Sequence, residues 1–299
     1  MKLGLIGVGN MGIHFGANLL AASVDLTVFD INEQALAKMG EKGAKIAKSV
    51  TDLARQVDVI LLCLPTPAIV ENIVCGDEGI LTSGDQLSII IDLSTTGPEA
   101  TERVAAMCRK NGISYIGAPV SGGTTGAEKG TLTIMASGDR DAMEKVQPVL
   151  DIIGGKIFYL GDAPQFGQYM KLINNTLSAV AAVASFEGLV LGAKAGLDPA
   201  QMLDVINVSS GRNSATLEKI PQCVLERNFP MRFTTDLLHK DVKLCLEQAE
   251  RLGATMFMGP SAKQFLSFAV SQGDGPKDYG EGIKHFENWA GVQFGNEAN

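Results

Sequence analysis

Short apolar runs alternate with amphipathic segments along the first half of the chain. β-Branched residues are frequent in these runs, and several runs are apolar at every position, as expected for strands covered by helices on both faces. The alternation predicts a doubly wound, mainly parallel α/β sheet of the Rossmann type. The predicted strands are KLGLIGV, LTVFD, VDVILLCL, SIIID, ISYIG, LTIMAS and KIFYL.

Helical patterns replace the strands after Gly161. The segment from about residue 164 to residue 195 is apolar nearly all round, which predicts a long buried helix. Gly196 is a typical helix end, and Asp198 followed by Pro199 is typical of the cap and first turn of a new helix. We therefore predict an α/β domain over residues 1–162 and an all-α domain over residues 163–299, built around a long interdomain helix.

The charge and cysteine content narrow the possible partners. The 299 residues carry a formal net charge of -8, which disfavours nucleic acid and anionic membranes as partners. The five cysteines are odd in number and contain no C-x-x-C pair, so we expect buried thiols in a reducing cytoplasm. No membrane span is expected because Glu187 interrupts the longest apolar stretch, and the amino terminus has no leader pattern.

A glycine-rich turn follows the first predicted strand. Gly7, Gly9 and Gly12 match G-x-G-x-x-G between a strand and a helix, and Asn10 and Met11 lie within the turn. Glycines at this spacing allow the backbone and the helix amino terminus to approach the pyrophosphate of a dinucleotide. The turn therefore predicts that residues 1–162 bind a nicotinamide cofactor.

Asp30 ends the second predicted strand, at about the 20-residue distance where a carboxylate accepts the ribose hydroxyls of NAD. Its negative charge would repel the 2′-phosphate of NADP, and no arginine follows in DINEQ to counter that repulsion. The sequence therefore favours NAD over NADP. The alternative is that Asp30 only caps the next helix.

Three further loops follow predicted strands: residues 64–67 (LPTP), residues 92–98 (DLSTTGP) and the segment containing Ser121, Gly122 and Gly123. In an open parallel sheet such loops emerge at the edge where ligands bind. Successive exposed N–H groups of a glycine-rich backbone form a nest for an anion. We predict that Ser121, Gly122 and Gly123 bind a small carboxylate; the alternative is a flexible turn.

Hydride transfer at a carbon that bears oxygen needs a group that exchanges a proton with that oxygen. Lys171, in GQYMKLINN near the start of the long apolar helix, is the best candidate because a lysine in apolar surroundings is costly unless it is paired or functional. Asn175 lies at i+4, on the same helix face. The alternative for Lys171 is a solvated lysine at a helix start.

Lys240, in HKDVKL, is a second candidate for a positive charge at the site. It would lower the pKa of Lys171 if the two amines approached, and it is equally well explained as an exposed lysine paired with a neighbouring acid. His14, His239 and His285 have no metal-like spacing. No metal site is therefore expected.

Four motifs occur in the order found in one known family: GLIGVGNMG, DLSTTGP, APVSGGTTGAEKGTL and GQYMKLINN, with HKDVKL further on. On these motifs, and over essentially its whole length, the sequence resembles the β-hydroxyacid dehydrogenases of the 3-hydroxyisobutyrate dehydrogenase group. The resemblance implies that Lys171 is the general acid/base. It also implies that Asn175 and the backbone of residues 121–123 hold the carboxylate and hydroxyl of the substrate.

The resemblance further implies a cofactor cleft lined by Leu64, Pro65 and Thr95, with Lys240 beside the nicotinamide. It implies that the cleft lies between the two domains, and that the helical domain forms a homodimer or homotetramer. Related 6-phosphogluconate dehydrogenases carry a histidine where this chain has Asn174, and imine reductases usually replace the lysine, so both activities are disfavoured.

These observations together predict an NAD-dependent oxidoreductase that converts the C3 hydroxyl of a small 3-hydroxy acid, such as 3-hydroxyisobutyrate, to the semialdehyde. Two alternatives remain open. One is a reductase of a small semialdehyde of the tartronate or succinic type, which the same residues would serve. The other is a protein that binds NAD without catalysis.

Overall fold

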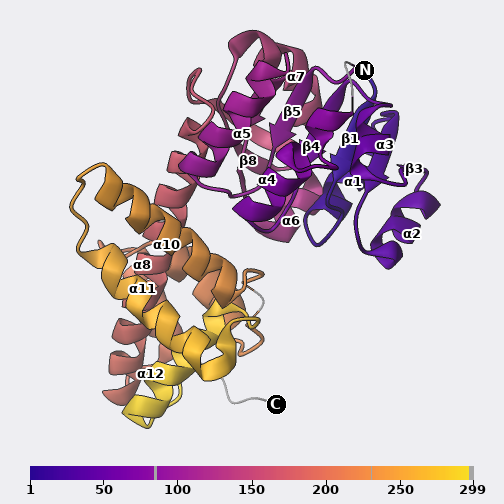
Figure 1. Cartoon of the computed structure of the whole chain (residues 1–299). Helices are drawn as coiled ribbons and strands as arrows, with labels where there is room; N and C mark the ends of the chain where they lie inside the picture. Colours follow the sequence, from indigo (N-terminus) through magenta and orange to yellow (C-terminus); the bar gives the residue numbers. More distant parts are fainter. Residues whose placement is uncertain (84–85, 230, 296–299) are drawn as a thin grey trace. The chain divides into compact units, whose positions relative to one another are not determined.

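The computed structural model describes residues 1–83, 86–229 and 231–295, in two compact units (Figure 1). The first unit comprises Met1–Lys171 and the second Leu172–Asn299. The unit boundary falls within one helix, α8 (Phe166–Lys194), which begins in the first unit and continues into the second. The domain boundary after residue 162 stays a prediction.

Six parallel strands form the main sheet of the first unit, in the order β3-β2-β1-β4-β5-β6. This order is that of a dinucleotide-binding Rossmann sheet, and the fold class predicted from the sequence is confirmed. β1 is the central strand, pairing with β2 on one side and β4 on the other. The strands are β1 (Leu3–Ile6), β2 (Leu26–Phe29), β3 (Lys45–Ile46), β4 (Val59–Leu62), β5 (Ile89–Asp92) and β6 (Ser114–Gly117).

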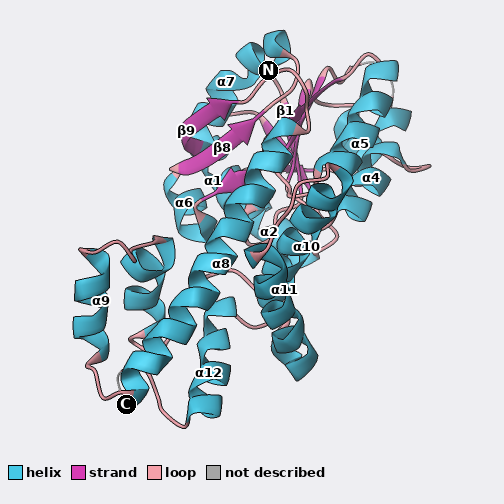
Figure 2. Ribbon diagram, turned by 90° about the vertical axis from the view of Figure 1, so that its left-hand side faces the viewer, coloured by secondary structure: helices cyan, strands magenta, loops and turns pink. Residues whose placement is uncertain are grey.

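Helices cover both faces of this sheet, as Figure 2 shows. Because successive strand residues point to opposite faces, Leu3 and Leu5 pack in one apolar core with α1, α2 and α7, whereas Ile6 packs in the other with α3, α4 and α5. The helices of this unit are α1 (Gly12–Ala21), α2 (Glu33–Glu41), α3 (Val50–Ala54), α4 (Pro67–Cys75), α5 (Pro98–Lys110), α6 (Gly123–Lys129) and α7 (Arg140–Ile153), with a 3₁₀ turn at Ile80–Thr82.

A second, three-stranded sheet contains β7 (Val120–Ser121), β8 (Leu132–Ala136) and β9 (Gly154–Tyr159). The sequence pattern places β8 and β9 in the parallel sheet, and this placement is wrong. After β6, Pro119 has no N–H with which to extend a ladder, and the chain turns so that β7 pairs antiparallel with β8. The two-residue strands β3 and β7 are too short to show an alternating pattern, and the sequence analysis missed both.

The second unit is helical around α8, as predicted. The side chain of Asp198 accepts a hydrogen bond from the Gln201 N–H at the start of α9, and Gly196 has φ +87°, so the predicted helix end and cap are confirmed. The other elements are α9 (Pro199–Asn207), α10 (Thr235–Arg251), α11 (Met258–Ala269) and α12 (Ile283–Ala290), the π-helical segments η2 (Ala215–Val224) and η3 (Val270–Asp274), and the 3₁₀ turn η4 (Tyr279–Gly282).

One side of α8 is the centre of the apolar core of the second unit, where Phe186 and Leu189 are almost fully buried. The expectation that α8 is buried all round is wrong, because Leu177 and Leu191 are 65% and 71% exposed. By length and composition alone α8 is apolar enough to cross a membrane, a test that core helices of soluble proteins also pass, and 44% of its most apolar window is buried.

The first turn of α8, which belongs to the first unit, packs closely on the ends of β6 and β8. Gly167 permits this contact, because a Cβ at that position would lie 2.2 Å from the carbonyl oxygen of Met135 and 3.1 Å from Cδ of Pro119. The N–H of Gly167 donates to Oγ of Ser137, which in turn donates to the carbonyl oxygen of Pro164. The helix therefore begins against the ends of β6 and β8.

Gln168 attaches the same turn to the loop that follows β5. Its Oε1 accepts hydrogen bonds from the N–H groups of Thr96 (3.0 Å) and Gly97 (3.1 Å), and its Nε2 donates to the carbonyl oxygen of Ser94 (3.0 Å). Gln168 is fully buried, so water does not compete for these groups. One side chain thus satisfies three backbone groups of the loop.

We expect Gln168→Leu to lower the free energy of unfolding by about 3 kcal/mol, because the three buried backbone groups lose their partner. Urea unfolding followed by circular dichroism measures the change. Gln147→Leu on α7 is the matched control, since among the described residues the amide of Gln147 bonds only Asp151, one turn away. Equal stability of the two variants would contradict the role of Gln168.

Candidate functional site

The three glycines of the first loop have different steric reasons for being glycine. Gly7 has φ +93°, and a Cβ there would lie 2.2 Å from the carbonyl oxygen of Cys63; a Cβ on Gly12 would lie 1.9 Å from the carbonyl oxygen of Gly7. A Cβ on Gly9 would meet no described heavy atom within 4 Å. The first and third glycines therefore permit close backbone packing, and the second leaves space beside the loop, as a dinucleotide pyrophosphate requires.

Asp30 lies at the end of β2 and supports this loop. Its Oδ2 accepts a hydrogen bond from the N–H of Val8 (2.7 Å), and its Oδ1 accepts one from the N–H of Asn32 (2.9 Å). The cap of α2 is the side chain of Asn32, so the alternative role of Asp30 as a helix cap is wrong. The carboxylate is half-buried beside the glycine turn, where a ribose would lie. Asn10 is exposed and Met11 is half-buried in the same turn.

The loops after β4 and β5 lie side by side. The N–H of Leu64 donates to Oγ of Ser94 (2.9 Å), and a Cβ on Gly7 would lie 3.2 Å from Cδ2 of Leu64, so the glycine loop adjoins them. Pro65 is exposed and Thr95 is half-buried. The structure therefore brings the predicted cofactor residues of the first unit to one edge of the sheet.

Asp92, at the end of β5, holds the loop that follows this strand through side-chain hydrogen bonds. Its Oδ1 accepts from the N–H of Ser94 (3.0 Å), and its Oδ2 accepts from the hydroxyls of Tyr115 (2.7 Å) and Thr96 (3.4 Å). Burial raises the pKa of Asp92 above its usual value, although these hydrogen bonds oppose the shift. Its position and its partners indicate a structural role under the loop that carries Thr95.

Ser121 ends β7, and Gly122 and Gly123 follow with φ +131° and +62°. Both glycines are exposed, and a Cβ on Gly123 would meet no described heavy atom within 4 Å. Positive φ explains why glycine is used at both positions. The exposed backbone at this turn is compatible with the predicted contact to a small carboxylate, which stays a prediction.

Lys171 lies on α8 one turn after Gly167 and next to the turn held by Gln168. Its residue exposure is 8%, so the alternative of a solvated lysine is wrong. Residues four apart share a helix face, and the face of Gly167 is the one packed against Met135 and Pro119. Lys171 therefore lies near the helix face that packs, at Gly167, against Met135 and Pro119.

Asn175, one turn after Lys171 on α8, belongs to a polar network of the second unit. Its Nδ2 donates to Oδ2 of Asp241 (2.6 Å), and its Oδ1 accepts from Nδ2 of Asn174 (3.2 Å). Nζ of Lys240 lies 3.1 Å from Oδ1 of Asp241. Asp241 is buried and thus fixes both predicted residues, Asn175 and Lys240, as one group.

Sequence reasoning missed three buried polar residues that hold predicted site residues, or the loops that carry them, in place, namely Gln168, Asp92 and Asp241. Each lies inside a motif that the sequence analysis quoted: GQYMKLINN, DLSTTGP and HKDVKL. A buried polar side chain is costly unless it is hydrogen-bonded. A polar residue within these motifs could therefore have been predicted to be hydrogen-bonded. The sequence does not show which residue is its partner.

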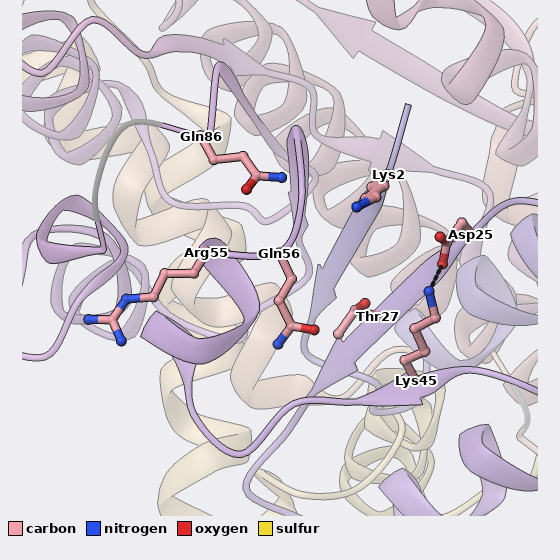
Figure 3. Close-up of a pocket in the computed structure, with 7 residues that line it drawn as sticks. All are labelled: Lys2, Asp25, Thr27, Lys45, Arg55, Gln56 and Gln86. Carbon is pink, nitrogen blue, oxygen red and sulfur yellow. Dashed lines mark hydrogen bonds and ion pairs between the residues drawn. The ribbon is translucent and has the colours of Figure 1, made fainter.

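A pocket of about 270 Å³ lies at the opposite edge of the main sheet (Figure 3). It is lined by residues at the amino ends of the strands, including Lys2, Asp25 and Lys45, and Lys45 is turned toward Asp25 at 2.6 Å. Ligands of such folds bind at the carboxyl ends of the strands. This pocket is therefore separate from the candidate site.

Two of the three histidines have local partners. His239 bonds Oγ of Ser267 (2.9 Å), and His285 bonds Oδ2 of Asp274 (2.6 Å). Within the described residues, no group of three or more His, Cys, Asp or Glu side chains is arranged to hold a metal ion.

Comparison with known proteins agrees with this geometry. Residues 2–161 match a family model described as the NAD binding domain of 6-phosphogluconate dehydrogenase, and residues 166–286 match one described as the NAD-binding domain of NADP-dependent 3-hydroxyisobutyrate dehydrogenase. The protein is therefore of the class of NAD(P)-dependent oxidoreductases that act on CH–OH donors. NAD, with NADP less favoured, is compatible with these matches.

Individual relatives are similar over nearly their whole length. The chain is 37% identical to 2-(hydroxymethyl)glutarate dehydrogenase of Eubacterium barkeri, covering 98% of this chain and 97% of the relative. It is 34% identical to 3-hydroxyisobutyrate dehydrogenase of Pseudomonas aeruginosa, covering 89% and 91%. The structure of Mycobacterium tuberculosis 3-hydroxyisobutyrate dehydrogenase with L-serine matches with a TM-score of 0.86 at 29% identity, covering 95% and 98%. The chain belongs to the β-hydroxyacid dehydrogenase family, as its motifs predicted.

The different surroundings of Gly9 and Gly12 give a direct test of the cofactor loop. We expect Gly9→Ala to fold like the wild type but to lose NAD affinity, because the added methyl group enters the space beside the loop. Gly12→Ala should lower stability by about 1 to 3 kcal/mol through overpacking. Thermal melting and titration calorimetry with NAD separate the two effects.

Gly188→Ala is the control, because Gly188 lies on α8 in the second unit with no described atom within 4 Å of its Cβ position. It should leave NAD affinity unchanged. Wild-type NAD affinity of Gly9→Ala would show that the cofactor does not approach this loop.

Proposed function

We propose that the protein is an NAD-dependent dehydrogenase that oxidises the C3 hydroxyl of a small 3-hydroxy acid to the semialdehyde. The observation that carries this proposal is the buried Lys171 on α8. Gln168, one turn away, bonds to the loop after β5, in the unit that carries the glycine loop. A buried lysine so attached is suited to exchange a proton with a substrate.

Lys171 removes the proton of the substrate hydroxyl during oxidation and returns it during reduction. Bound NAD would supply the hydride acceptor, held by Gly7, Gly9, Asn10, Met11 and Gly12, with its ribose at Asp30 and further contacts from Leu64, Pro65, Thr95 and Lys240. Asp30 supports NAD over NADP because a second negative charge near its carboxylate is unfavourable.

We propose Ser121, Gly122, Gly123 and Asn175 as the residues that contact the substrate carboxylate. Asp241 holds the amide of Asn175 at 2.6 Å and so fixes which way its carbonyl and amino groups point. The substrates in the names of the similar proteins, 2-(hydroxymethyl)glutarate, 3-hydroxyisobutyrate and L-serine, all carry a hydroxymethyl group on the carbon next to a carboxylate. We propose HOCH₂–CH(R)–COO⁻ as the common substrate element.

The same residues would serve the alternative of a reductase of a small semialdehyde of the tartronate or succinic type, because Lys171 can also give a proton to the oxygen of the aldehyde. The direction in the cell depends on metabolite concentrations. All five cysteines are free thiols, which supports a reducing compartment such as the cytoplasm.

We expect Lys171→Met to lower kcat by about a hundredfold to ten-thousandfold while NAD still binds, since general acid/base catalysis contributes about that factor. Absorbance of NADH at saturating hydroxy acid measures turnover, and NAD titration calorimetry measures binding. Lys194→Met is the matched control, an exposed lysine at the end of the same helix. Near-wild-type turnover of folded Lys171→Met would exclude this mechanism, and NAD binding without turnover by the wild type would favour the non-catalytic alternative.

We also propose that the helical unit forms a homodimer or homotetramer. A mainly apolar groove of about 360 Å³ lies between α8, α11 and α12. Trp289 and Met258 in this groove are 60% and 59% exposed. Contiguous exposed apolar surface of this kind is typical of an interaction site, and a second copy of the chain would bury it.

Trp289→Asp should dissociate the oligomer, because the substitution places a charge in the apolar contact. Light scattering after gel filtration measures the mass, and Trp289→Phe is the control that keeps the contact apolar. Trp289 is the sole tryptophan of the sequence, so a red shift of its fluorescence on dilution would report the same event. A monomeric wild type would overturn this assignment.

A further inference from the structure

Lys219 is a cationic side chain of the second unit to which the proposed reaction gives no role. It lies on η2, and its Nζ donates hydrogen bonds to Oγ of Ser178 (2.8 Å) and to the hydroxyl of Tyr279 (2.8 Å). The amine also lies 5.4 Å from the centre of the Tyr279 ring. Ser178 is on α8 and Tyr279 is on η4, so three elements meet at this amine.

The partners of Lys219 are neutral although its own group is a cation. Burial lowers the pKa of Lys219, and the nearby carboxylates of Glu218 and Asp278 oppose that shift without forming an ion pair with it among the described residues. Asp278 is turned to backbone N–H groups instead, those of Gly280 (3.0 Å) and Arg232. An ammonium has three donors, and the described residues use two of them, so one donor and the positive charge are left for a ligand.

The hydrogen bond to Ser178 shows where the amine of Lys219 lies along α8, compared with the proposed substrate-binding residues. Ser178 follows Asn175 by three positions and Lys171 by seven on α8, which puts all three on one helix face. The rise from Asn175 to Ser178 is about 4.5 Å along the axis. Lys219 is therefore held about one turn beyond the asparagine that would bind the substrate carboxylate.

We propose that Lys219 binds a second carboxylate of the substrate, so that the R group of HOCH₂–CH(R)–COO⁻ ends in a carboxylate. This inference rests on the proposed function and names its substrate class, a hydroxymethyl dicarboxylic acid. Asn175, in the same unit, binds the carboxylate next to the reacting carbon, and Lys219 binds the distal one. A site built to bind a charged group discriminates strongly against analogues that lack it.

The test compares kcat/KM for 2-(hydroxymethyl)glutarate and 3-hydroxyisobutyrate with NAD in the wild type and in Lys219→Met. We expect the wild type to prefer the diacid. Lys219→Met should lower kcat/KM for the diacid by about a hundredfold, since truncating one partner of a buried charge contact has an effect of that order. It should leave the value for the monoacid unchanged within error.

Two further variants separate recognition from a structural role. Lys219→Arg keeps the charge and should retain a preference for the diacid, whereas Lys243→Met, an exposed lysine of α10 with a 58% exposed side chain, should change neither substrate. Glutarate should inhibit the wild type competitively and Lys219→Met much more weakly.

The outcomes distinguish this inference from the proposed function. Turnover of the monoacid without preference for the diacid, or an equal loss for both substrates in Lys219→Met, would overturn the role of Lys219 and leave the dehydrogenase intact. Absence of turnover with every hydroxymethyl acid and NAD would overturn the proposed function, and this inference with it.

Discussion

The buried hydrogen bonds between the amide of Gln168 and the backbone of Ser94, Thr96 and Gly97 are the constraint on which the candidate site depends. They join the start of α8 to a loop of the parallel sheet. Because a helix is rigid over one turn, they also fix Lys171. Hydrogen bonds in a dry environment are electrostatically stronger than in water, so this attachment holds the lysine without help from solvent.

The glycine loop was readable in the sequence, for steric reasons. Gly7 and Gly12 are glycines because a Cβ would collide with backbone, whereas a Cβ on Gly9 would meet no described heavy atom within 4 Å. Because such steric requirements apply to single positions at fixed spacing, they produce a short motif that can be recognised in the sequence. The alternation of strands and helices is likewise local, and the fold class followed from it.

The features that could not be predicted from the sequence depend on contacts between residues far apart in the chain. Gln168 bonds Thr96, which is 72 positions away, and Asn175 bonds Asp241, which is 66 positions away. The periodic pattern of apolar residues does not predict such partners. The second sheet follows from a chain reversal near Pro119, which apolar runs do not specify. The apolar pattern of α8 predicted burial on every side, but it could not show that Leu177 and Leu191 are exposed.

Asp30 makes cofactor choice and loop geometry interdependent. One of its oxygens holds the N–H of Val8 beside the glycine turn, while its charge disfavours a 2′-phosphate. A change to alanine or serine that removes the charge also removes the support of the turn. Asparagine is therefore the substitution of Asp30 that best combines NADP binding with a stable turn, because its side-chain carbonyl can still accept the hydrogen bond from the N–H of Val8. Cofactor exchange in this protein is a problem of backbone support as much as of charge.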